Sequence, residues 1–194
     1  VLVLPPPGAI AVYGIITRDD HRSLARLTKI FPSGRIIAAM QDFAGKPYAA
    51  LYRVEGALQI APQKMVHARL GDRIELIGYD LTREENTITL TVHWGSIAET
   101  RDDYTVFVHL VGAVNPATGS PVWAQDDARP GRGSFPTMRW QAGEVVIDEY
   151  RLALPGNLPR GDYAIEIGMY ILETGARARV TDANGAPMEN NRVF

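Results

Sequence analysis

The sequence contains no cysteine, which excludes disulfide bonds and thiolate metal sites. No apolar run approaches the ~20 residues that a membrane-spanning helix requires. Acidic and basic residues nearly balance, with a formal net charge of −2, so no strongly basic surface is available for nucleic acid. The motifs GxSxG, HExxH, the phosphate-binding GxxxxGK[ST] and the EF-hand loop are all missing. We therefore expect no cofactor and no nucleic-acid partner, and we assign no metal site.

The 194 residues have the composition of a globular protein, with 46% hydrophobic and 22% charged residues. The pattern changes near residue 57, and we expect a small α/β segment over 1–57. Because the chain begins with Val1, we also expect it to be a piece of a longer protein, with this segment the end of a larger α/β unit. The segment is predicted to have β-α-β-β order, with strands at Val1–Leu4, Arg35–Met40 and Tyr48–Val54, a helix at about His21–Ile30 and a hairpin turn at Asp42–Pro47.

Residues 58–194 alternate with a period of two, which is typical of antiparallel strands. Ile88, Leu90, Val92 and Trp94 share one face, whereas Thr87, Thr89, Thr91 and His93 share the other, which we expect to face water. Short strands separated by Gly/Pro turns predict a mainly β protein, an antiparallel β-sandwich of immunoglobulin or jelly-roll type with about eight strands. The expected strands are 66–70, 73–81, 86–94, 104–111, 122–126, 145–154, 162–171 and 177–181.

Three carboxylates are candidate site residues. Asp126 and Asp127 end one expected strand, and Asp148 lies among apolar residues of another. A buried carboxylate must be paired or hydrogen-bonded. The preferred interpretation is a structural one, in which the acid ties the loop 127–144 to the sheet through an arginine or backbone amides. A calcium site and a glycosidase-like acid pair are the alternatives.

Aromatic and histidine side chains offer further candidates. Trp123 and Trp140 lie at the edges of strands or loops, where flat rings could stack on a sugar, although most tryptophans in a sandwich belong to the core. His93 and His109 could form a pair if their strands are neighbours; ordinary isolated histidines are the simpler interpretation.

Several stretches resemble a known family. They are 24–54 (LARLTKIFPSGRIIAAMQDFAGKPYAALYRV), 71–81 (GDRIELIGYDL), 90–112 (LTVHWGSIAETRDDYTVFVHLVG), the run from AQDD to RLALP at 124–155, and 161–177 (GDYAIEIGMYILETGAR). Together they are similar to the C-terminal extracytoplasmic region of bacterial membrane glycosyltransferases of family 39, the dolichyl-phosphate-mannose–protein mannosyltransferase type. Those enzymes use a lipid-linked sugar donor, and their catalytic acids lie beside N-terminal membrane helices that this chain does not contain.

The resemblance implies a soluble, extracytoplasmic accessory domain that is not catalytic by itself. In the full-length protein it would be tethered to the membrane and contact that protein's own membrane helices, with a glycan or glycolipid as partner. Three alternatives stay open: a stand-alone carbohydrate-binding module, an enzyme that uses Asp126, Asp127 or Asp148, and an adhesion or assembly domain.

Overall fold

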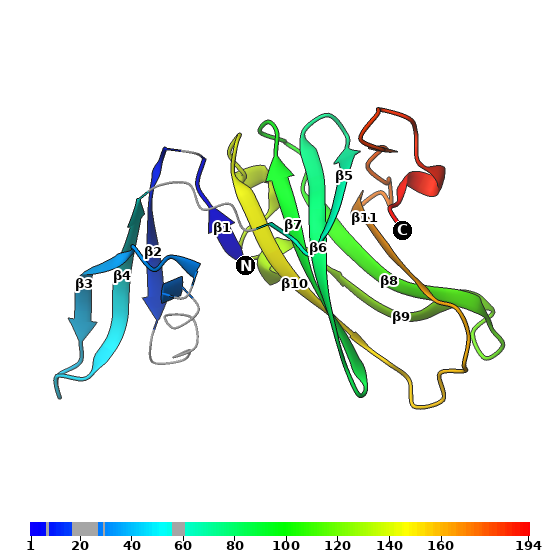
Figure 1. Ribbon diagram of the computed structural model, residues 1–194, viewed down its shortest axis with the longest axis horizontal. Coiled ribbons are helices and arrows are strands. Elements are labelled where there is room, and N and C mark those ends of the chain that lie inside the picture. Colours follow the sequence, from blue (N-terminus) through cyan, green and yellow to red (C-terminus); the bar gives the residue numbers. More distant parts are fainter. Residues whose placement is uncertain (7, 17–26, 29, 56–60) are drawn as a thin grey trace. The chain divides into compact units, whose positions relative to one another are not determined.

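The structure is a computed structural model that describes residues 1–6, 8–16, 27–28, 30–55 and 61–194 (Figure 1). The fold is mainly β, and its sheets are antiparallel. Two compact units are present: a larger one made of residues 1–3 and 61–194, and a smaller one made of residues 4–60. The division therefore falls three residues beyond the boundary predicted at 57/58, and the first three residues join the larger unit. Within the described residues, no helix is long and apolar enough to cross a membrane.

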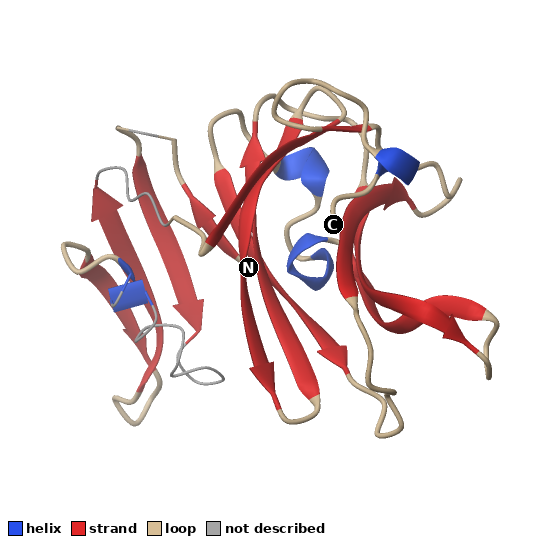
Figure 2. Cartoon of the chain, turned by 45° about the vertical axis from the view of Figure 1, so that its right-hand side comes forward, coloured by secondary structure: helices blue, strands red, loops and turns tan. Residues whose placement is uncertain are grey.

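The larger unit is a sandwich of two sheets (Figures 1 and 2). One sheet has six strands in the order β1 (Leu2–Leu4), β10 (Val145–Ala153), β7 (Thr87–Ser96), β6 (Ile74–Glu84), β5 (Lys64–Leu70) and β12 (Val180–Thr181). The other has three strands in the order β11 (Ala164–Ile171), β8 (Tyr104–Asn115) and β9 (Ser120–Ala128). Two short helical turns, η1 (Pro130–Gly133) and η2 (Thr137–Arg139), lie in the connection between β9 and β10, and a third, η3 (Glu189–Asn191), follows β12; helical turns are blue in Figure 2. All eight strands expected beyond residue 58 are present, although the one expected at 177–181 is reduced to the two residues of β12.

The core lies between the two sheets and follows the predicted alternation. Leu90, Val92 and Trp94 of β7 are fully buried, and Val106 and Val108 of β8 are fully buried too. This burial of apolar area is the main force that holds the sheets together.

The opposite face of β7 differs from the prediction at one residue. Its three threonines are half-buried, but His93 is 1% exposed, with its Nε2 at 2.9 Å from the Asp80 carboxylate. The prediction that His93 faces water is therefore wrong. The physical reason is that β7 is an inner strand with β6 beside it. Asp80 of β6 gives the His93 ring a hydrogen-bond partner, so the ring can be buried.

The smaller unit is a three-stranded antiparallel sheet in the order β2 (Ile10–Ile16), β4 (Pro47–Glu55) and β3 (Arg35–Gln41). Tyr52 of β4 anchors it: its ring is buried, and its hydroxyl donates to the Phe31 carbonyl at 2.7 Å. The Phe31 ring stacks on Tyr13 of β2 at 5.6 Å between ring centroids. The expected hairpin turn is present, with Asp42 accepting the backbone N–H groups of Ala44 and Lys46.

Two elements of the smaller unit differ from the sequence prediction. The predicted first strand, Val1–Leu4, joins β10 of the larger unit instead, and β2, which was not predicted, takes its place in the small sheet. A three-residue strand carries no signal of its partner, because its hydrogen bonds are made to residues distant in sequence. Most of the predicted helix at His21–Ile30 lies outside the described residues; Leu27, Thr28 and Ile30 are helical.

Candidate functional site

Asp148 is a structural carboxylate beneath the loop that carries η1. Its side chain is almost completely buried, and it accepts the Gly131 backbone N–H at 2.7 Å and the Tyr150 hydroxyl at 3.1 Å. Gly131 has a φ of 61°, a conformation that suits glycine, so the turn can present its N–H to the acid. Burial, reinforced by the Asp148 charge, raises the pKa of Tyr150 well above its ordinary value. Asp148 therefore holds the loop against β10 through hydrogen bonds. This is the structural role that the sequence analysis preferred for it.

Asp126 links the same loop to both sheets. Its two carboxylate oxygens accept the Arg132 guanidinium at 2.6 and 2.5 Å, and one of them also accepts the Arg151 backbone N–H of β10 at 2.7 Å. Burial alone would raise the pKa of Asp126, but the hydrogen bonds from Arg132 and Arg151 and the Arg132 charge hold it below its usual value. Its carboxylate is thus already supplied with three donors.

Asp127 belongs to a different network, because adjacent residues of a strand point to opposite faces. It accepts from His109 Nε2 at 3.0 Å and from the Tyr170 hydroxyl at 3.3 Å. His109 Nδ1 lies 3.7 Å from the buried Glu166, which is in turn paired with Arg192. Burial and then Asp127 raise the pKa of Tyr170 above its ordinary value. The network holds the C-terminal segment to β11 and β8.

These contacts leave the acid-pair and calcium interpretations without support. Asp126 and Asp127 point to opposite faces, and all three acids are occupied by donors of the protein itself. Among the described residues, no group of three or more histidine and acidic side chains is arranged to hold a metal ion. The conditional pair of His93 and His109 does not form, since β7 and β8 belong to different sheets.

The two candidate tryptophans have different environments. Trp140 is 1% exposed, and its indole N–H donates to the Phe135 carbonyl at 3.1 Å, so the ring has no free face for a sugar. The sugar-platform interpretation is therefore wrong for Trp140, which is a core residue that closes the loop after η2. Trp123 is half-buried, donates to the Ala113 carbonyl at 2.8 Å and sets its ring edge-on to Tyr163 at 6.2 Å.

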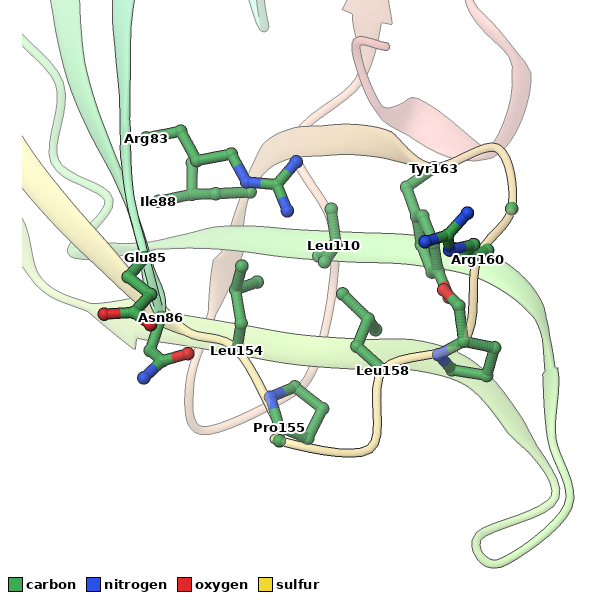
Figure 3. Close-up of a pocket in the computed structure, with 13 residues that line it drawn as sticks. Arg83, Glu85, Asn86, Ile88, Leu110, Leu154, Pro155, Leu158, Arg160 and Tyr163 are labelled. Carbon is green, nitrogen blue, oxygen red and sulfur yellow. The ribbon is translucent and has the colours of Figure 1, made fainter.

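A pocket of about 420 Å³ opens at the end of the sandwich, beside Tyr163 (Figure 3). Ile88, Leu110, Leu154, Leu158 and Tyr163 give it apolar walls. Polar side chains of the β6–β7 hairpin and the β10–β11 corner complete it, namely Arg83, Glu85, Asn86 and Arg160. Apolar and polar side chains line the pocket in similar measure. A concave site that combines apolar walls with polar side chains is suited to a ligand, so we take this pocket as the candidate functional site.

The pocket is shaped by a corner that the sequence builds locally. The Tyr163 hydroxyl donates to the Pro159 carbonyl at 2.9 Å, which is the tyrosine-corner arrangement of immunoglobulin-like sandwiches. The Leu158 N–H closes a turn onto the Pro155 carbonyl at 3.0 Å. The Leu154 N–H donates to the Asn86 carbonyl at 2.9 Å and ties the corner to the β6–β7 hairpin. The two segments that form the mouth of the pocket are therefore held together by backbone hydrogen bonds.

Sequence reasoning did not find this site. A tyrosine two residues after Gly161, at the start of a strand, was the available signal for the corner. No comparable signal marks Arg83 or Leu110, which reach the pocket from other strands.

Comparison with known proteins finds no match: no family model, no curated protein and no solved structure is significantly similar to the chain.

Proposed function

We propose that the chain is an extracytoplasmic accessory domain of a membrane-bound glycosyltransferase, of the family that its sequence resembles, and that it positions glycan or acceptor instead of transferring sugar. One observation carries the proposal: Asp126, Asp127 and Asp148, the acids best placed for chemistry, are engaged in holding loops and the C-terminal segment. Transfer would then depend on acids elsewhere in the full-length protein, beside its membrane helices. A pocket with apolar walls and polar edges suits a domain that binds and orients.

The stand-alone carbohydrate-binding alternative receives less support. It requires an exposed aromatic platform, but Trp140 is buried, and the Trp123 ring packs against Tyr163. A module of this kind would have to bind sugar with aromatic side chains other than these two tryptophans, such as the exposed Phe43.

The coding frame upstream of the Val1 codon tests the membrane assignment. We expect about ten apolar segments of roughly 20 residues each, the length that spans a bilayer. A frame without such segments would overturn the proposal.

Acid-to-amide variants of the full-length protein test whether the acids of this chain take part in sugar transfer. We expect Asp126→Asn, Asp127→Asn and Asp148→Asn to lower the melting temperature while sugar transfer per folded molecule, measured well below that temperature, stays within about twofold of the wild type. Loss of transfer by two or more orders of magnitude in a folded variant would place catalysis in this chain, because the removal of an essential acid or base costs about 10²–10⁴-fold.

A further inference from the structure

We propose that the pocket at the end of the sandwich binds an amphiphilic anion: a phosphate or carboxylate group carried on an aliphatic chain, with the anion between Arg83 and Arg160. The inference does not depend on the chain's belonging to a transferase. It rests on the charge of the pocket edge and on the chemistry of its walls.

The edge of the pocket carries two uncommitted guanidinium groups. Within the described residues, neither the Arg83 nor the Arg160 side chain makes an ion pair or a hydrogen bond, whereas the side chains of Arg129, Arg132 and Arg192 of the same unit each pair with a carboxylate. Figure 3 shows Arg83 extending toward the middle of the pocket and Arg160 beside Tyr163, on the other side of Leu110. Two arginines that flank one opening are suited to a single anionic group, to which they can donate charge-assisted hydrogen bonds.

Glu85 does not neutralise this pair. It is the acidic residue among those that line the pocket, and in Figure 3 its carboxylate extends away from the opening that Arg83 enters. The edge therefore has a net positive charge, which attracts an anion and disfavours a cationic ligand.

The walls select the rest of the ligand. Ile88, Leu110, Leu154 and Leu158 are branched aliphatic side chains without hydrogen-bonding groups, and the Tyr163 hydroxyl is already committed to Pro159. Against these aliphatic walls the hydroxyl groups of a sugar would lose water without gaining partners, whereas a hydrocarbon chain has no hydrogen bonds to lose. An aliphatic body thus fits the walls better than a saccharide does.

Trp123 provides a reporter for the test, because its ring lies edge-on to Tyr163 in the pocket wall. Decyl phosphate, kept below its micelle concentration, is titrated into the purified chain and followed by tryptophan fluorescence and calorimetry. Inorganic phosphate and decyl glucoside serve as the head-only and neutral-chain probes. We expect decyl phosphate to bind at least roughly tenfold more tightly than either, since both the charge and the chain contribute.

Variants locate the binding. We expect Arg83→Ala and Arg160→Ala each to weaken decyl phosphate binding by roughly tenfold, because each removes a charge-assisted hydrogen bond. Leu154→Gln should weaken it as well, whereas Arg101→Ala, at an exposed arginine outside the pocket lining, should leave it unchanged. Circular dichroism confirms that each variant is folded. Equal binding of inorganic phosphate, equal binding of decyl glucoside, no binding of decyl phosphate, or equal loss in Arg101→Ala would each overturn the proposal.

Discussion

At the scale of single residues, three carboxylates of this protein hold loops and the C-terminal segment against the sheets. Asp148 and Glu166 are buried and Asp126 is half-buried, and each accepts hydrogen bonds from a segment that would otherwise be an unattached loop or end. A buried carboxylate is costly unless it is satisfied, so these contacts also determine which loop conformation is compatible with the core.

Removal of the Asp148 carboxylate should be strongly destabilising. Asp148→Ala leaves the Gly131 N–H and the buried Tyr150 hydroxyl without their acceptor, and we expect a loss of roughly 2–4 kcal/mol. Asp148→Asn keeps a carbonyl oxygen and should lose less. Urea denaturation of both variants measures the difference, and equal stability of Asp148→Ala and the wild type would contradict the assigned role.

Tyr150 should make the protein sensitive to alkali. Burial, reinforced by the Asp148 charge, raises its pKa in the folded state above the value of about 10 that applies in the unfolded chain. The neutral hydroxyl therefore stabilises the fold fully below about pH 10, and this stability is lost as the pH rises further. Unfolding free energies measured between pH 8 and 11 should fall less steeply in Tyr150→Phe than in the wild type. The variant should still lose some stability at high pH, because burial and then Asp102 raise the pKa of Tyr104 to about 12. Identical slopes would rule out this origin.

At the scale of elements, the sheets depend on close contacts between paired strands. Gly168 of β11 is opposite Phe107 of β8, and the Phe107 ring covers it so closely that a Cβ on residue 168 would lie 2.3 Å from the ring. The ring is fully buried, with the Arg177 guanidinium 4.6 Å from its centroid, so it has little room to move.

Gly168→Ala should therefore be destabilising, by roughly 1–3 kcal/mol, because the added methyl group forces the ring or the strand to shift. The matched control is Gly156→Ala, since nothing lies within 4 Å of a Cβ at that glycine. Thermal unfolding compares the two variants. Equal melting temperatures would show that the strands adapt without cost.

The strands of the sandwich could be predicted from sequence, whereas the strands of the smaller sheet could be predicted only in part. The difference has a physical reason. In β7 the alternation of Leu90, Val92 and Trp94 with threonine already encodes which face is buried, because side chains alternate along any strand. The partner of a short strand such as β1 depends on hydrogen bonds to β10, about 140 residues away in sequence, as the ranges Leu2–Leu4 and Val145–Ala153 show. Local pattern carries no information about such a partner.

The candidate site was less predictable than the fold. Asp126, Asp127 and Asp148 could be identified from sequence as acids that need partners, and an arginine or backbone amides were the partners expected. The pocket combines Arg83 of β6, Leu110 of β8 and Tyr163 of the β10–β11 corner, and none of them stands out by itself. Only the packing of the hairpin against the β10–β11 corner brings them together.

At the scale of the whole molecule, the chain consists of two units with separate sheets. Each has its own buried aromatic and aliphatic side chains, such as Trp94 and Leu90 in the larger unit and Phe31 and Tyr52 in the smaller. A domain of the larger unit's size can bury enough apolar area to fold alone.

A fragment of residues 61–194 should therefore fold into the sandwich. It lacks β1, which leaves β10 as an exposed edge, so we expect a melting temperature a few degrees below that of the same transition in the full chain. Calorimetry of the full chain should show a second transition that the fragment lacks. A fragment without cooperative unfolding would show that the sandwich needs residues 1–60.

The sequence by itself determined the class of this protein: a mainly β chain whose strands beyond residue 58 alternate buried and exposed positions. It did so because apolar periodicity is local and is read along each strand. The tertiary structure alone decided how the acids are used and that Trp140 is enclosed. It also decided that a pocket opens at the end of the sandwich with two arginine side chains that have no partner in the described part of the chain. These properties arise from contacts between segments far apart in the chain, which no local pattern specifies.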